Sequence, residues 1–291
     1  CDEVVDRAVL LMRHSASTFD RSINDLLNNL TDHGRNLCAS LGESLPKDIR
    51  VRGYASPAQR CVETAELVIA AHVAAGGEGA RTRALEALGV FYALDQRKMW
   101  KILTTSDGLA DYVAKWFAEK VPIDAMIPAP QAVDLVMQVL LPKLERRMAG
   151  RSLDLCVTHD MTVFTLRHGL GLEPVSGPDV EFLDGLMLFE IGGRTFVRSH
   201  HGGEVEVEMG EVGFHLPKDR VGLGFEPAGY QLTGLIGADK ARNKYEAAVG
   251  LDDVREREAL VKAELGAIEL ARRRFGIDDI GGGAVLGCGD C

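Results

Sequence analysis

The chain has 291 residues, a length that favours one large domain or one domain with an extension. Hydrophobic residues make up 46% and charged residues 26%, which excludes a mostly disordered protein, a collagen-like fibre and a disulfide-rich miniprotein. The formal net charge of −10 disfavours nucleic acid as a partner, although a local arginine cluster could still bind a phosphate group. Because no uncharged apolar run approaches the roughly 20 residues of a membrane-spanning helix, we expect no membrane partner either.

Short apolar runs predict strands, and helical spacing of apolar residues predicts the helices between them. The expected strands are residues 8–12, 49–54, 82–88 and 153–158, followed by a hairpin of 179–191 and 194–200. The expected helices are residues 31–45 with Thr31 as N-cap, a helix opened by Ser56-Pro57, residues 107–120, residues 131–148 and a helix ending near Leu166. This alternation predicts an α/β protein, a three-layer α/β/α sandwich with a mostly parallel sheet and a helical C-terminal extension.

The character of the chain changes near residue 209, which predicts three parts. We expect an α/β domain at residues 1–209, a linker at 210–237 and a charged helical extension with a Gly/Cys-rich tail at 238–291. The extension has balanced charge and a thin apolar stripe, which predicts self-association or a partner helix.

Cysteine usage indicates a reducing compartment. Cys38, Cys61 and Cys156 lie in apolar contexts that predict small core residues. No secretory signal is visible, so we expect a cytoplasmic protein without a disulfide framework. The terminal Cys288-x-x-Cys291 and the pair His200-His201 do not have the usual spacing of a zinc site, and no metal is predicted.

Three of the predicted strands end in residues that can handle phosphate. Arg13-His14 follows the first strand, Ser56-Pro57-x-x-Arg60 follows the second, and His159-Asp160 follows 153–158. Ligands of open α/β sheets bind at the carboxyl ends of the strands. Arginine matches phosphate oxygens with a planar fork, a neutral histidine can attack phosphorus, and a carboxylic acid can protonate a leaving alcohol. If the strands are neighbours, these groups converge on one phosphate site.

Four motifs, in this order and spacing, resemble the histidine phosphatase superfamily, the fold of phosphoglycerate mutases and histidine acid phosphatases. They are Leu-Met-Arg13-His14, Leu30-Thr31-x-x-Gly34, Ser56-Pro57-x-x-Arg60-x-x-x-Thr64-Ala65 and Val157-Thr158-His159. Phe182-Leu183-Asp184-Gly185 also suits a closing strand of that family. The similarity covers roughly residues 6–205, and it identifies 1–209 as the catalytic domain.

The resemblance implies a role for each matching residue. His14 would be the nucleophile that becomes phosphohistidine, while Arg13, Arg60 and His159 would hold the phosphoryl oxygens. One branch of the family takes its proton donor directly after the second histidine, which here is Asp160. The mutase-like branch takes a glutamate after the second arginine motif, where Glu86 matches best by position. Asp160 is favoured because it is present, and no metal or other cofactor is implied.

Two positions depart from the mutase-like pattern. Ser15 stands where glycine is usual, and Asn28 stands where an arginine often precedes the Leu-Thr pair. The expected activity is hydrolysis of a phosphomonoester on a small phosphorylated molecule. A phosphoglycerate-mutase-like phosphotransferase and a non-catalytic module that binds phosphorylated ligands are the alternatives.

Overall fold

The structure is a computed structural model, and it describes residues 5–210 except 19, 21, 146–148 and 175, together with residues 213–215. Its strands are β1 (Arg7–Arg13), β2 (Ile49–Ala55), β3 (Glu78–Ala84), β4 (Arg151–Thr158), β5 (Gly185–Ile191), β6 (Arg194–Ser199), β7 (Glu204–Gly210) and β8 (Gly213–His215). Its α-helices are α1 (Asp32–Ser44), α2 (Gln59–Ala74), α3 (Gln96–Thr104), α4 (Gly108–Phe117), α5 (Ala129–Glu145) and α6 (Asp160–Gly169). Two short 3-10 helices are η1 (Asp25–Leu27) and η2 (Glu86–Leu88).

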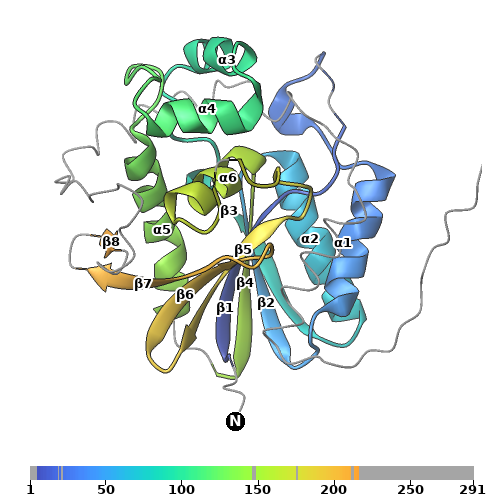
Figure 1. Cartoon of the computed structure of the whole chain (residues 1–291). Helices are drawn as coiled ribbons and strands as arrows, with labels where there is room; N and C mark the ends of the chain where they lie inside the picture. The colour runs from blue at the N-terminus through green and yellow to red at the C-terminus, as the bar shows by residue number, and fades with distance from the viewer. Residues whose placement is uncertain are drawn as a thin grey trace, which may run out of the picture.

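The described strands form one sheet in the order β3-β2-β4-β1-β5-β6-β7-β8 (Figure 1). The pairs from β3 to β1 are parallel, and the pairs from β1 to β8 are antiparallel. The expectation of a mostly parallel sheet is therefore wrong for the second half. Parallel neighbours need a long crossover, whereas Gly192 and Gly193 join β5 to β6 directly, and both have the positive φ that a two-residue hairpin turn requires.

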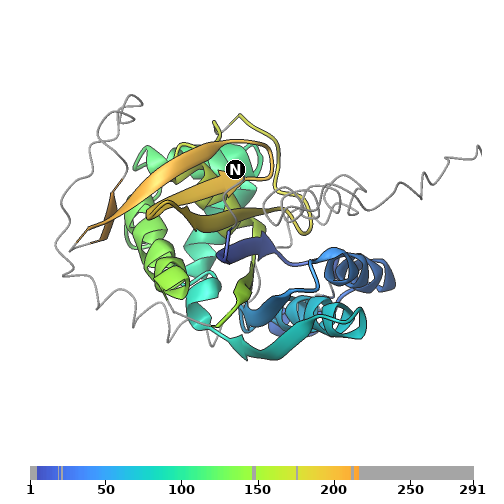
Figure 2. The same ribbon diagram turned by 90° about the horizontal axis from the view of Figure 1, so that it is seen from below.

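Helices cover both faces of the sheet, which confirms the three-layer arrangement (Figure 2). Successive residues of β1 alternate between the faces, as strand geometry demands. Leu10 and Met12 pack in the core that α1 and α2 close. Val9 and Leu11 pack in the core that the helices α3 to α6 close.

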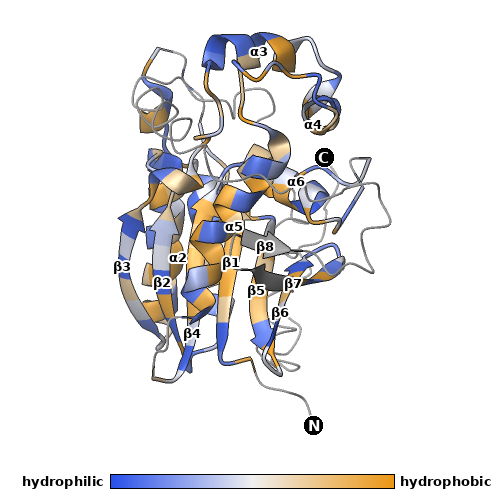
Figure 3. Ribbon diagram, turned by 90° about the vertical axis from the view of Figure 1, so that its left-hand side faces the viewer, coloured by the Kyte–Doolittle hydropathy of each residue, from blue (hydrophilic) through white to orange (hydrophobic). Residues whose placement is uncertain are grey.

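The largest differences from the predicted elements lie where the apolar signal is weak. The predicted strand 82–88 is β3 at 78–84 followed by η2, because β3 is an edge strand with mostly exposed residues and lacks an apolar pattern. Figure 3 shows this contrast between the hydrophilic edge strand and the hydrophobic centre of the sheet. Helix α2 begins at Gln59 with Ala58 as N-cap, so Ser56 does not open it. Helix α3 and strands β7 and β8 were not predicted.

Several expectations are confirmed in detail, and others fall outside the described residues. Thr31 caps α1 by accepting a hydrogen bond from the Gly34 N–H. Cys38 and Cys156 are buried free thiols, and burial raises the pKa of each to about 12. Apart from β8, the linker and the extension at 238–291 lie outside the part of the chain that the structure describes. None of the described helices is long and apolar enough to span a bilayer.

Candidate active site

The carboxyl ends of β1, β2 and β4 meet at one edge of the sheet. In the parallel ladders Arg13 is opposite Thr158, and Ala55 is opposite Val157. The register continues one residue beyond the strands, where the His14 N–H donates to the Thr158 carbonyl at 2.9 Å and the Ser56 N–H donates to the Val157 carbonyl at 2.9 Å. The three strands are therefore neighbours, which is the condition for their end residues to converge.

His14 is held with a defined orientation. Its side chain is buried, and Nδ1 lies 2.8 Å from the Ser15 carbonyl oxygen. A carbonyl only accepts hydrogen bonds, so Nδ1 carries the proton. On the opposite side of the ring, Arg60 Nε donates to Nε2 at 3.3 Å. His14 is thus a neutral imidazole whose Nε2 lone pair points to the arginine.

Arg60 is paired with a carboxylate that the sequence motifs did not reveal. Its Nη1 donates to the Asp25 side chain at 2.8 Å and to the Asp25 carbonyl at 3.0 Å, and both side chains are 3% exposed. Asn28 in turn donates to Asp25 Oδ1 at 3.2 Å. Asn28, which stands where the resemblance leads one to expect an arginine, therefore orients the Asp25 carboxylate that holds Arg60. The polar stretch around η1 has no periodicity, so only its three-dimensional placement reveals this role.

The second histidine, His159, lies beside the first. The two ring centroids are 5.7 Å apart in an edge-to-face arrangement. His159 Nε2 is 2.9 Å from the Ser56 hydroxyl and 3.9 Å from Cys61 Sγ. Ser56, expected to cap a helix, thus orients the imidazole of His159.

Arg13 is fixed by the loop that precedes β5. Its Nη1 donates to the Val180 carbonyl at 2.9 Å, and its guanidinium lies 4.2 Å from the centroid of the Phe182 ring, close enough for a cation–π contact. Its Nη2 is 3.6 Å from Asp160 Oδ2. The segment 182–184 was expected to be part of a strand, but it forms this loop, and β5 starts at Gly185.

The two candidate proton donors differ in their placement. Asp160 is the first residue of α6, its Oδ1 accepts from the Met161 N–H, and its side chain is 14% exposed. Glu86 opens η2, whose Leu88 carbonyl accepts a 2.6 Å hydrogen bond from the Thr158 hydroxyl. Both candidates thus lie at the carboxyl edge of the sheet, and Asp160 contacts Arg13.

A second polar cluster lies behind Arg13. The backbone N–H of Arg13 donates to the carbonyl of Asp184 at 2.8 Å. The Asp184 carboxylate is completely buried and contacts Arg167, His200 and His201. Burial raises its pKa, but the hydrogen bonds from the two histidines and the charge of Arg167 outweigh burial and lower the pKa to about 2.

A cavity of about 600 Å³ lies away from these residues, along β2 and β3. Four arginines contribute to its lining, Arg50, Arg52, Arg81 and Arg83. None of the residues around His14 lines this cavity. The candidate active site is therefore defined by its grouped reactive side chains and not by the cavity.

Comparison with known proteins gives one family match. Residues 9–81 match the model of the histidine phosphatase superfamily (branch 1). No curated protein matches the chain. Among solved structures, the chain is similar to a mutant phosphoserine phosphatase from Entamoeba histolytica, with a TM-score of 0.45, 14% identity and coverage of 66% of this chain and 95% of that one.

Two further solved structures illustrate the range of neighbours. A phosphoglycerate mutase from Bacillus anthracis has a TM-score of 0.38 and 18% identity, with 68% of this chain and 93% of that chain covered. The alpha-ribazole phosphatase from Shigella flexneri has a TM-score of 0.42 and 14% identity, with 66% and 95% covered. The family match over residues 9–81 includes Arg13, His14 and Arg60, and it confirms the resemblance to the histidine phosphatase superfamily that the sequence motifs indicate.

Proposed function

We propose that this protein hydrolyses a phosphomonoester on a small phosphorylated molecule through a phosphohistidine formed on His14. The observation that carries the proposal is the state of His14, a buried neutral imidazole whose Nε2 faces Arg60 at 3.3 Å. A nucleophilic histidine needs a lone pair directed at phosphorus and cations that hold the phosphoryl oxygens. His14 and Arg60 supply these two requirements in direct contact.

In the first step the phosphate oxygens bind Arg13, Arg60 and His159. Nε2 of His14 attacks phosphorus in line, a P–N bond forms, and the P–O bond to the leaving alcohol breaks. Asp160 gives its proton to the leaving oxygen. Since the transferred group carries spread negative charge, positioning and charge stabilisation supply most of the rate enhancement.

In the second step water attacks the phosphohistidine. Asp160, now a carboxylate, accepts a proton from the water, the P–N bond breaks, and inorganic phosphate leaves. Asp160 is the preferred donor because its side chain is 14% exposed, whereas those of Arg13 and Arg60 are 3% exposed. A leaving group that extends toward solvent would lie beside Asp160, where the carboxylic acid can protonate it.

The test is phosphate release from a panel of phosphomonoesters, including a generic aryl phosphate, by the full chain and by His14→Ala. We expect release to fall by at least about 10³-fold in the variant, because removal of a covalent nucleophile leaves only binding and electrostatic catalysis. The matched control is His33→Ala, which removes an exposed histidine of α1 and should retain the rate. Acid-labile labelling of the wild type alone would identify the phosphohistidine.

The remaining outcomes of this experiment distinguish the alternatives. Unchanged release by His14→Ala would exclude the mechanism. If the wild type releases no phosphate but transfers a phosphoryl group from a bisphosphate primer, the protein is a mutase-like phosphotransferase. Binding of phosphorylated compounds without any turnover would make it a non-catalytic binding module.

A further inference from the structure

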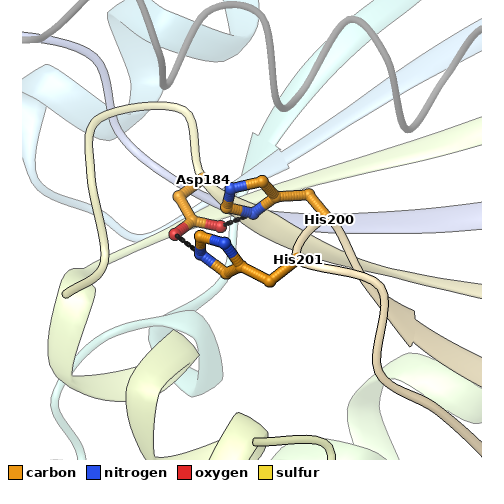
Figure 4. Close-up of side chains that lie close together, drawn as sticks. All are labelled: Asp184, His200 and His201. Atoms are coloured by element: carbon orange, nitrogen blue, oxygen red, sulfur yellow. Dashed lines mark hydrogen bonds and ion pairs between the residues drawn. The ribbon is translucent and has the colours of Figure 1, made fainter. Parts of the chain in front are cut away.

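We propose that Asp184, His200 and His201 form a binding site for a transition-metal dication, with Zn²⁺ as the best match. Figure 4 shows the two imidazoles directing ring nitrogens at the two oxygens of one carboxylate. The three donor atoms all lie within 4.8 Å of one another. The inference concerns a site separate from the phosphate pocket and does not rest on the proposed function.

The backbone builds the cluster from two turns far apart in the sequence. Asp184 stands directly before β5, after Leu183 with φ of +61°. The left-handed region is unfavourable for a leucine, so the fold maintains this turn against local strain. His200 and His201 occupy the turn between β6 and β7, which the Ser199 N–H closes by donating to the Gly203 carbonyl at 2.8 Å.

Each imidazole meets a different carboxylate oxygen. His200 Nδ1 contacts Asp184 Oδ1, and His201 Nε2 is 3.3 Å from Oδ2. Oδ1 and His200 Nδ1 are both buried and contact each other directly. A metal ion bound by both atoms would take the place of the proton between them.

The charges around the cluster leave one carboxylate uncompensated. Arg167 pairs with Asp184 Oδ2 at 3.1 Å and with Glu173 Oε2 at 3.0 Å. The side chains of Asp184, Glu173 and Arg167 are at most 9% exposed, so solvent screens them little. Two carboxylates and one guanidinium sum to one negative charge, which favours a cation beside Oδ1.

The donor set selects the class of metal. Imidazole nitrogens suit Zn²⁺, Cu²⁺ and Ni²⁺, whereas Mg²⁺ and Ca²⁺ prefer oxygen ligands alone. Zinc commonly takes three protein ligands and one water at sites that keep an open position. The side chains of His200 and His201 are 9% and 20% exposed, which gives a water and an entering ion access from the side of the turn. Arg167 lies on Oδ2, so Oδ1 is the oxygen that would coordinate.

The location makes the site relevant to the phosphate pocket. The carbonyl of Asp184 accepts the backbone N–H of Arg13, and Arg13 is also held by Val180 in the same loop. An ion that crosslinks Asp184 to the β6–β7 turn would stiffen the support of Arg13.

The experiment measures Zn²⁺ binding by the full chain with Cys288→Ser and Cys291→Ser, which removes the thiol pair of the tail as a competing site. Zn²⁺ affinity is determined by competition with a chromophoric chelator, and Co²⁺ is added separately to record visible d–d bands. We compare this background with His201→Ala, with the double variant His200→Ala/His201→Ala, and with His33→Ala as the matched histidine control.

We expect one Zn²⁺ per chain, binding weakened at least about tenfold in His201→Ala and by about 100-fold or more in the double variant, and no change in His33→Ala. The Co²⁺ bands should vanish with the two histidines and show no thiolate charge-transfer band. Absence of Zn²⁺ binding by the background, equal affinity in His201→Ala, or a thiolate band would overturn the proposal. If the double variant does not fold, His201→Ala decides, since it leaves the buried contact of His200 with Asp184 in place.

Discussion

The two histidine clusters on either side of Arg13 use the same residue types with opposite charge. Around His14, the guanidinium groups of Arg13 and Arg60 face Asp160 and Asp25. When Asp160 carries a proton, as the first chemical step requires, this cluster has one excess positive charge. The cluster around Asp184 has the excess of one negative charge described above.

In these two clusters, the group that faces each imidazole nitrogen decides whether the cluster suits an anion or a cation. The Nε2 of His14 accepts from a guanidinium N–H, so it holds a lone pair in a field that attracts phosphate. The ring nitrogens of His200 and His201 face a carboxylate, an arrangement that suits a metal ion. One cluster therefore suits an anionic ligand and the other a cation, although the Arg13 N–H donates directly to the Asp184 carbonyl.

Replacement of Asp160 by Asn should have the largest effect, because it keeps the excess positive charge of the cluster but removes the proton that the leaving oxygen needs. We expect kcat for an alkyl phosphate to fall by about 10²–10⁴-fold, the usual contribution of a general acid. The loss should be smaller for an aryl phosphate, whose leaving group needs less protonation. The comparison variant is Glu86→Gln, measured with the same two substrates. A large loss in that variant with little loss in Asp160→Asn would reverse the assignment of the donor.

Replacement of Asp25 by Asn tests the balance of charge at Arg60. Because the pair is 3% exposed on both sides, breaking it leaves a buried guanidinium uncompensated, and we expect the free energy of unfolding to fall by about 3 kcal/mol. Inorganic phosphate should restore more stability to the variant than it adds to the wild type, since it no longer shares Arg60 with a carboxylate. Denaturant unfolding with and without phosphate measures both effects.

The control for that experiment is Asp32→Asn. Asp32 pairs with Arg35 at 3.0 Å but is 99% exposed. Exposed pairs contribute little, so we expect a change within about 0.5 kcal/mol and no response to phosphate. Equal behaviour of the two variants would show that Asp25 has no special relation to the pocket.

His72 provides a reference histidine outside both clusters, with a smaller expected effect. It is buried, its Nε2 lies 3.1 Å from the Ile49 carbonyl, and desolvation by burial lowers its pKa from 6.5. The unfolded chain therefore takes up a proton more readily than the folded chain, and stability should fall as the pH falls below about 6.5. The free energy of unfolding between pH 7.5 and 5.5, compared with His72→Gln, isolates this contribution. The same pH dependence in both proteins would contradict it.

The motifs at the strand ends were predictable because their placement follows from sheet geometry. Arg13, His14 and His159 come directly after apolar runs, and parallel neighbours bring such positions to one edge. Asp25 was not predictable, because η1 is a turn of three residues whose approach to Arg60 depends on how it folds back over α2. The edge strand β3 was misplaced for a related reason, since exposed residues do not reveal the period of a strand.

The sequence by itself determined the α/β alternation, the buried central strands, the cap of α1 and the four ordered motifs, three of which lie within the family match at residues 9–81. These features depend on local periodicity and on neighbours along the chain. Only the tertiary structure decided the antiparallel pairing of β5 with β1, the addition of β7 and β8 to the sheet, the pairing of Asp25 with Arg60 and the meeting of Asp184 with His200 and His201. Such contacts join segments through turns and cores, and the free energy that selects them comes from packing and charge that no local pattern records.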